Sequence, residues 1–133
     1  MNILFLCNGN VARSQEAELF FNNLSVDKST HAMSAGLNVK IGKPIDPLVV
    51  EVMKESGYDM GNAERKLLIE SMVDTADLIV SFKSKDELPD YVHDRDNVQF
   101  WDIPDPQQQS IEFHRKTRDQ IHSKVVSLLR DLL

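Results

Sequence analysis

Residues 2–14 read NILFLCNGNVARS and change character twice within this short span. After Asn2, residues 3–6 are an apolar run short enough to be a buried β-strand, and Cys7 follows it directly. A small polar loop containing Gly9 then leads to Arg13, where the apolar spacing becomes that of a helix. The stretch therefore predicts a strand, a tight loop and a helix in immediate succession.

A loop in this position is suited to binding an anion. Its backbone N–H groups converge, and the positive end of the following helix dipole adds to their attraction for negative charge. Arg13 supplies a planar guanidinium that binds two oxygens of a phosphate-like group at once, which a lysine cannot do. The expected substrate-binding residues are Asn8, Gly9, Asn10, Val11, Ala12, Arg13 and Ser14.

Cys7 is the candidate nucleophile of this loop. A helix N-terminus and a guanidinium both favour the reactive thiolate form of a nearby cysteine. A lone free cysteine is more often an inert core residue, so its presence alone does not indicate catalysis. The spacing Cys-x5-Arg between a strand and a helix reverses that balance and predicts Cys7 and Arg13 as catalytic residues.

Composition narrows the class of protein. The 133 residues, 41% hydrophobic and 27% charged, fit one soluble globular domain spanning residues 1–133. No apolar run is long enough to cross a membrane and no basic leader segment precedes the loop, so we expect a cytoplasmic protein with no membrane partner. The net charge of −6 argues against nucleic acid as a partner, because phosphodiester backbones bind basic surfaces. A single cysteine excludes an internal disulfide and a multi-cysteine metal site, and no metal or other cofactor is expected.

The rest of the chain alternates strand and helix patterns. Strands are predicted at about residues 2–6, 30–34, 77–82 and 97–101. Helical patterns are predicted at about residues 14–24, from Lys43 to Tyr58, briefly around 68–72, within 83–96, and from near Ser110 to the end. This alternation implies an α/β fold in which helices cover both faces of a parallel sheet.

A second chemical element, DIPDP at residues 102–106, follows the last predicted strand. Loops at the carboxyl ends of parallel strands share one edge of the sheet, so this loop faces the one after Cys7. A carboxyl group held there can protonate a departing oxygen. We predict Asp105 as that acid, with Asp102 as its competitor; as an alternative, both are simply turn residues.

Residues 7–14, CNGNVARS, resemble the phosphate-binding loop of the low molecular weight protein tyrosine phosphatases and of the arsenate reductases built on the same fold. Asp105-Pro106 resembles the family's Asp-Pro loop, which carries the general acid, although Gln107 stands where many of the phosphatases have tyrosine. The resemblance covers nearly the whole chain. It implies the phosphotyrosine phosphatase I-like fold, a three-layer α/β/α domain whose four-stranded parallel sheet has the order 2-1-3-4.

The resemblance also implies two supporting residues. Ser34 matches a serine that lies behind the catalytic loop in relatives. Asn62 stands where relatives commonly carry a histidine that holds the loop asparagine, here Asn10, in a strained conformation. Asn62 is therefore expected to hydrogen-bond Asn10.

The expected activity is hydrolysis of phosphate monoesters. Cys7 attacks phosphorus to form a phosphocysteine, while Arg13 and the loop amides hold the equatorial oxygens. Asp105 protonates the leaving group and then activates water, and Ser14 stabilises the departing sulfur. The expected partners are a phosphate monoester or phosphotyrosine protein as substrate, and phosphate, vanadate or arsenate as oxyanion ligands.

Two alternatives stay open. Ser14-Gln15 and the block at residues 101–106 resemble the arsenate reductase branch, but without a second cysteine such an enzyme needs an external thiol or a glutaredoxin-like partner. The other alternative is a non-catalytic phosphate or phosphoprotein binder, which the departures at Asn62 and Gln107 favour and which Cys7, Arg13 and Asp105 argue against.

Overall fold

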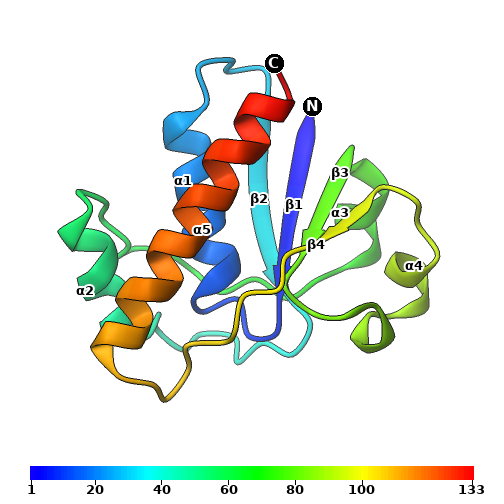
Figure 1. Cartoon of the computed structure of the whole chain (residues 1–133). Helices are drawn as coiled ribbons and strands as arrows, with labels where there is room; N and C mark the ends of the chain where they lie inside the picture. The colour runs from blue at the N-terminus through cyan, green and yellow to red at the C-terminus, as the bar shows by residue number, and fades with distance from the viewer.

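The computed structural model describes residues 1–133, and its centre is a four-stranded sheet (Figure 1). All strand pairs are parallel and the order is β2-β1-β3-β4, which confirms the predicted order 2-1-3-4. The strands are β1 (Asn2–Cys7), β2 (His31–Gly36), β3 (Leu78–Ser81) and β4 (Val98–Phe100).

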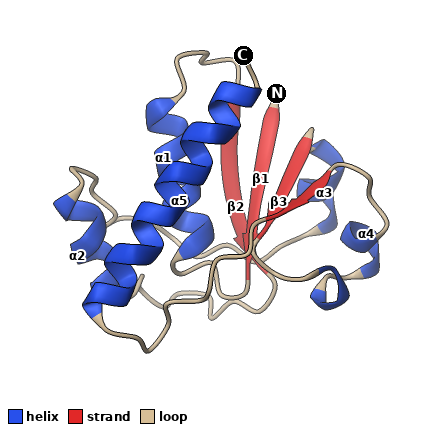
Figure 2. Ribbon diagram, viewed as in Figure 1, coloured by secondary structure: helices blue, strands red, loops and turns tan.

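Helices cover both faces of the sheet (Figure 2). The helices α1, α2 and α5 lie on one side, and α3 and α4 lie on the other, so the predicted three layers are confirmed. The helices are α1 (Arg13–Leu24), α2 (Pro47–Glu55), α3 (Glu70–Thr75), α4 (Asp90–His93) and α5 (Ile111–Asp131), with a 3₁₀ turn η1 at Lys85–Glu87.

Strand β1 contributes to two hydrophobic cores. Ile3, Phe5 and Cys7 face the larger core, formed with the helices on the side of α1 and α5. Leu4 and Leu6 face the smaller core on the side of α3 and α4. A central parallel strand that is buried on both faces has a continuous apolar sequence, which explains the run at the start of the chain.

Several predicted boundaries differ from the observed ones. The second strand extends beyond the predicted 30–34 and ends at Gly36. The second helix is shorter than Lys43 to Tyr58, because Asp46 caps it: its Oδ1 accepts the N–H of Leu48 at 2.9 Å. Ser110 caps the last helix in the same way, because its Oγ accepts the N–H of Phe113 at 3.2 Å. The helix therefore begins where it was predicted, near Ser110.

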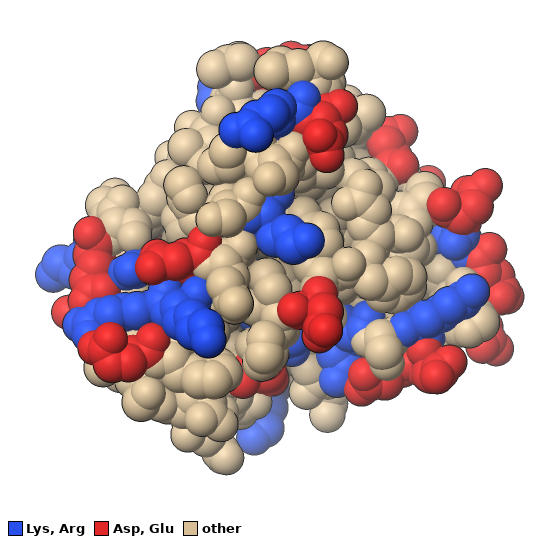
Figure 3. Space-filling model, viewed as in Figure 1, with Lys and Arg blue, Asp and Glu red and all other residues tan.

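Ion pairs join α2 to α5 on the outer surface. Glu55 of α2 forms ion pairs with two arginines of α5. Its Oε2 lies 2.7 Å from Arg115 Nη2, and its Oε1 lies 2.8 Å from Arg118 Nη1. Hydrogen bonds from these arginines lower the pKa of Glu55 to about 2. In Figure 3, Lys and Arg side chains lie beside Asp and Glu side chains over this part of the molecule. No helix is long and apolar enough to span a membrane.

Glu16, in the first turns of α1, is a buried carboxyl group that the sequence pattern did not single out. It is fully buried, and neither carboxylate oxygen has a hydrogen-bond partner. Burial raises its pKa to about 8, and the charges of Arg118 and Arg13 only partly oppose this effect. Glu16 is therefore mostly uncharged in the folded protein at neutral pH.

We expect Glu16→Met to remove a pH dependence of stability. An unfolded Glu16 ionises near its ordinary pKa of 4.5, whereas the folded group holds its proton up to about 8. Between these values only the folded state binds the proton, so the free energy of unfolding falls as pH rises. From about pH 6 to about pH 8.5, wild type should lose roughly 2–3 kcal/mol relative to the variant in urea unfolding.

Glu51→Met is the matched control for this measurement, because Glu51 is an exposed glutamate on α2. It should leave the pH dependence of wild type in place. The assignment of a protonated Glu16 would be contradicted if the free energies of unfolding of wild type and Glu16→Met differed by the same amount at every pH.

Candidate active site

Cys7 and Arg13 lie at the two ends of the loop between β1 and α1. Cys7 is the last residue of β1 and is buried, and Arg13 is the first residue of α1. Ala12 precedes the helix without a side-chain cap, so no side chain competes for the N–H groups of its first turn. These groups and the positive end of the helix dipole are available to an anion.

Ser14 contacts the sulfur of Cys7. The distance from Ser14 Oγ to Cys7 Sγ is 2.8 Å. Ser14 Oγ also accepts a hydrogen bond from Nδ2 of Asn10 at 2.8 Å. Because the hydroxyl has a single proton and already receives one bond, its own proton is free to point at the sulfur, as a group that stabilises a thiolate would do.

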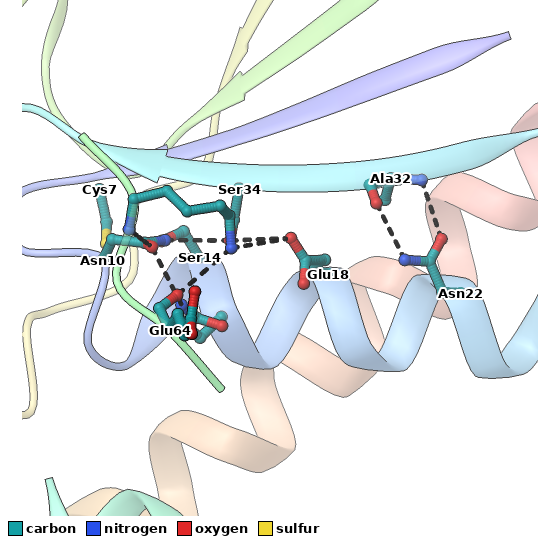
Figure 4. A network of polar contacts seen from close by, with 10 residues as sticks. Cys7, Asn10, Ser14, Glu18, Asn22, Ala32, Ser34 and Glu64 are labelled. Carbon is teal, nitrogen blue, oxygen red and sulfur yellow. Dashed lines mark hydrogen bonds and ion pairs between the residues drawn. The ribbon is translucent and has the colours of Figure 1, made fainter. Parts of the chain in front are cut away.

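Asn10 has the left-handed backbone conformation within the loop, with φ of 50°. Its buried side chain is fully hydrogen-bonded: Nδ2 donates to Ser14 and to Ser34 Oγ at 3.0 Å, while Oδ1 accepts from Gln15 Nε2 at 2.9 Å and from the N–H of Lys66 at 2.7 Å (Figure 4). Four bonds hold a conformation that a non-glycine residue rarely adopts. The strained asparagine and the serine behind the loop are both found where the resemblance implied.

Asn62 is not part of this network, contrary to expectation. Its side chain is exposed, and the amide of Asn10 is bonded by Gln15 and by the backbone of Lys66 instead. Gln15 is buried on the first turn of α1 and also donates to the carbonyl of Glu64 at 2.7 Å, which holds the segment 64–66 against the loop. Gln15 was not among the predicted site residues, and its position next to Ser14 is the signal that could have indicated this role.

A further chain of contacts extends from Ser34 (Figure 4). Ser34 Oγ donates to Glu18 Oε1 at 3.0 Å, and the same oxygen lies 3.6 Å from Lys66 Nζ. Lys66 therefore contacts the network at two points: its backbone N–H bonds Asn10, and its ammonium group lies beside Glu18.

Gly36 lets the end of β2 approach the loop. A Cβ at this position would lie 2.8 Å from both Asn8 O and Asn10 N. The next residues bond the loop directly, with the N–H of Leu37 donating to Cys7 O at 3.1 Å and that of Asn38 donating to Asn8 O at 2.8 Å. A side chain at position 36 would separate these backbones.

Arg13 bonds the backbone beyond the ends of two strands. From the start of α1 its Nη1 donates to Phe82 O at 3.2 Å, just after β3, and to Ile103 O at 2.9 Å, just after β4. The guanidinium carbon lies 5.6 Å from the centre of the Phe82 ring. Arg13 is only 5% exposed, so the guanidinium is held rigidly at the loop.

Asp105 lies on the other side of this guanidinium. Its Oδ2 is 3.6 Å from Arg13 Nη2, and its Oδ1 accepts the N–H of Gln107 at 3.0 Å. The side chain is 40% exposed, so it can meet a substrate that enters from solvent. Asp102 lies apart, in a groove along α5 with Glu112 and Arg115. The structure brings Asp105, and not Asp102, to Arg13.

A groove of about 520 Å³ opens beside the loop. Asn8, Gly9 and Val11 form its border with the loop, and Gln107 lies on it as well. Val11 and Ile45 are its only hydrophobic residues, and no aromatic side chain lines it. No cluster of three or more His, Cys, Asp or Glu residues in the chain is arranged to hold a metal ion.

We expect Gln15→Leu to lower kcat while leaving the fold intact. Leucine has a similar size but cannot donate to Asn10 and Glu64, so the loop loses one of the bonds that fix its shape. Small displacements of a catalytic loop are costly, and the expected loss is roughly tenfold in kcat with an aryl phosphate. Gln120→Leu, at an exposed position of α5, is the control; equal rates for the two variants would contradict the role of Gln15.

The profile of the family described as low molecular weight phosphotyrosine protein phosphatase matches residues 2–133. The chain belongs to this family. Among solved structures, the low molecular weight protein tyrosine phosphatase of T. tengcongensis is similar with a TM-score of 0.86 and 30% identity, covering 98% of this chain and 99% of that one. The family and the fold predicted from residues 7–14 are thereby confirmed.

Two other matches carry different activities in their names, and a third is again named as a tyrosine phosphatase. A YwlE arginine phosphatase, solved as a mutant with a phosphorylated active-site serine, has a TM-score of 0.88 and 25% identity over 99% of this chain and 95% of that one. Arsenate reductase 2 of Staphylococcus saprophyticus is 28% identical over 92% of both chains. A probable low molecular weight protein-tyrosine-phosphatase EpsP of Ralstonia solanacearum is 37% identical over 59% of this chain, a match that spans about half of that protein. Together the matches support a cysteine-based phosphatase, with arsenate reduction as the alternative.

Proposed function

We propose that this protein hydrolyses phosphate monoesters, including phosphotyrosine in proteins, through a phosphocysteine on Cys7. The observation that carries the proposal is the position of Arg13, which begins the helix after the Cys7 loop and also faces Asp105 at 3.6 Å. A nucleophile, an oxyanion-binding group and a carboxyl acid are thus supplied at one edge of the sheet. The phosphorylated active-site serine of the YwlE mutant further supports a covalent intermediate at this position.

In the first step, Cys7 forms a bond from sulfur to phosphorus as the bond from phosphorus to the ester oxygen breaks. The free edge of the Arg13 guanidinium and the loop N–H groups hold the three remaining oxygens, on which the transition state carries its charge. Nη1 of Arg13 is already bonded to Phe82 and Ile103, so Nη2 and Nε remain for the phosphate. Asp105, in its protonated form, gives its proton to the leaving oxygen.

In the second step, water attacks phosphorus and the sulfur–phosphorus bond breaks. Asp105, now ionised, takes a proton from the attacking water. The sulfur leaves as a thiolate and receives the hydrogen bond of Ser14. Inorganic phosphate, vanadate and arsenate have the shape and charge to bind the same loop as ligands.

Turnover of an aryl phosphate tests the proposed function. The purified protein should release phenol from phenyl phosphate in the presence of a metal chelator, and vanadate should inhibit this release. If the folded protein binds vanadate but releases no phenol, the result would contradict the proposal and favour a non-catalytic binder.

Replacing Asp105 tests the assignment of the acid. Asp105→Asn keeps the size of the side chain but cannot donate a proton, so turnover of esters with poor leaving groups should fall by roughly 100-fold to 10,000-fold. Nitrophenyl phosphate, whose leaving group needs little protonation, should lose far less. Asp102→Asn is the matched control, and an equal effect of that change on poor leaving groups would contradict the choice of Asp105.

Arsenate reduction is the second candidate, because relatives named arsenate reductases match along nearly the whole chain. Cys7 would attack arsenate and displace water, and an external thiol would then attack the Cys7 sulfur, forming a mixed disulfide as As(V) leaves as As(III). A second external thiol would release Cys7, so that two external thiols become a disulfide for each arsenate reduced. The chain has one cysteine, so both electrons have to come from outside. Arsenate-dependent oxidation of glutathione, with or without a glutaredoxin, would favour this activity if aryl phosphates are not hydrolysed.

A further inference from the structure

The groove beside the catalytic loop is lined by three cations that have no carboxylate partner. Lys40 and Lys43 are exposed, and neither ammonium group forms an ion pair or hydrogen bond. Arg65 donates Nη2 to Pro44 O at 2.8 Å, and its buried Nε has no partner. Three positive charges therefore face one open space next to the site where a phosphate would bind.

The pattern differs from that of the arginines between α2 and α5. Arg115 pairs with Glu55 and Glu112, and Arg118 pairs with Glu55 and Asp119. In the groove the only carboxylate is Asp46, and its Oδ1 already accepts the N–H of Leu48 as the cap of α2. The chain as a whole carries a net charge of −6, so this groove is a local positive region on an acidic protein.

The groove offers little to an aromatic ring. None of its lining residues is aromatic, and Gln107 follows the Asp-Pro pair. A substrate therefore gains little there from ring stacking or from apolar contact. Its charged and polar lining instead favours side chains that carry negative charge.

We propose that this groove binds acidic residues that flank the phosphorylated residue of a peptide substrate. This inference rests on the proposed phosphatase function, and it names the class of phosphoprotein that the site prefers. The groove is continuous with the loop residues Asn8, Gly9 and Val11, so a chain whose phosphate occupies the loop places its neighbouring side chains between Lys40, Lys43 and Arg65. Such pairs lie at the protein surface, so they are sensitive to salt.

Two phosphotyrosine peptides of equal length test the preference, one with Asp and Glu around the phosphotyrosine and the other with Asn and Gln. For wild type at low salt, kcat/KM should be roughly tenfold higher for the acidic peptide, and added salt should reduce this ratio. The double variant Lys40→Gln/Lys43→Gln should bring the ratio close to one. Lys116→Gln/Lys124→Gln removes the same charge from exposed positions of α5 and should keep the ratio of wild type.

Three outcomes would overturn the inference: equal kcat/KM for the two peptides, a ratio that survives in Lys40→Gln/Lys43→Gln, or a ratio lost equally in both double variants. The last result would mean that net charge alone steers the peptide. Phenyl phosphate, assayed in parallel with wild type, separates these failures from failure of the proposed function. If phenol is released while the peptide ratio is one, the phosphatase function stands and the acidic preference is wrong.

Discussion

Cys7→Ser is expected to abolish turnover of phenyl phosphate, with a loss in kcat of at least about 10,000-fold. A serine hydroxyl is a much weaker nucleophile than a cysteine sulfur near neutral pH. Arg13 and the loop amides stay in place in this variant. Binding of vanadate or phosphate, measured by calorimetry, should therefore persist.

Cys7→Ala separates loss of the nucleophile from slow transfer to serine. Both variants should fail to turn over, but only serine retains an oxygen that can accept a phosphoryl group. Substantial multiple turnover by Cys7→Ala would contradict the assignment of Cys7 as nucleophile. Loss of vanadate binding in both variants, with the fold retained, would show that the sulfur itself holds the oxyanion.

Arg13→Lys is expected to reduce kcat/KM by roughly 1,000-fold although the charge is retained. The guanidinium has two roles in the proposed mechanism: Nη1 bonds the carbonyls of Phe82 and Ile103, and Nη2 and Nε are left to bind the phosphate. An ammonium group is a point charge and cannot anchor to both carbonyls while also binding two phosphate oxygens.

Arg13→Lys should lower kcat strongly but change the stability of the fold little, since one buried cation replaces another. Thermal unfolding and the rate with phenyl phosphate, measured on the same preparation, give this comparison. Arg95→Lys, at an arginine paired with Asp74 away from the loop, is the control. Activity within a few fold of wild type in Arg13→Lys would contradict bidentate binding of the phosphate by Arg13.

The strand, loop and helix at the start of the chain could be predicted because local signals agree there. Residues 3–6 are apolar at every position, a pattern typical of a short strand that is buried on both faces. The order of the strands came from the resemblance, because periodicity does not determine which strands pair. The structure confirms it through β1, which pairs with both β2 and β3.

The partner of Asn10 could not be predicted from alignment with the family pattern. Residues 57–69 have no regular periodicity, so their path past the loop is set by tertiary contacts such as the bond from Gln15 to Glu64 O. That path presents the backbone N–H of Lys66 to Asn10 and leaves Asn62 in solvent. Asn62, the residue that matches the family's histidine in sequence, is therefore not the residue that contacts Asn10.

The two candidate acids illustrate a related limit of sequence patterns. Asp102 and Asp105 are three residues apart in a loop rich in turn-forming residues, and their local chemistry is the same. Their positions differ because Arg13 bonds the carbonyl of Ile103, which fixes the loop between them. Glu16 went unrecognised for a different reason: a glutamate in a helix is expected on the surface, and its burial depends on how α1 packs against α5.

Detection of phosphate on Cys7 during turnover tests the proposed mechanism most directly. Wild type mixed with an excess of nitrophenyl phosphate and quenched in acid within a single turnover should show a mass increase of one phosphate, located on the peptide that contains Cys7. Asp105→Asn, which lacks the base for the second step, should accumulate more of this species. Hydrolysis of the ester with no phosphate on Cys7 in either protein would contradict a phosphocysteine mechanism.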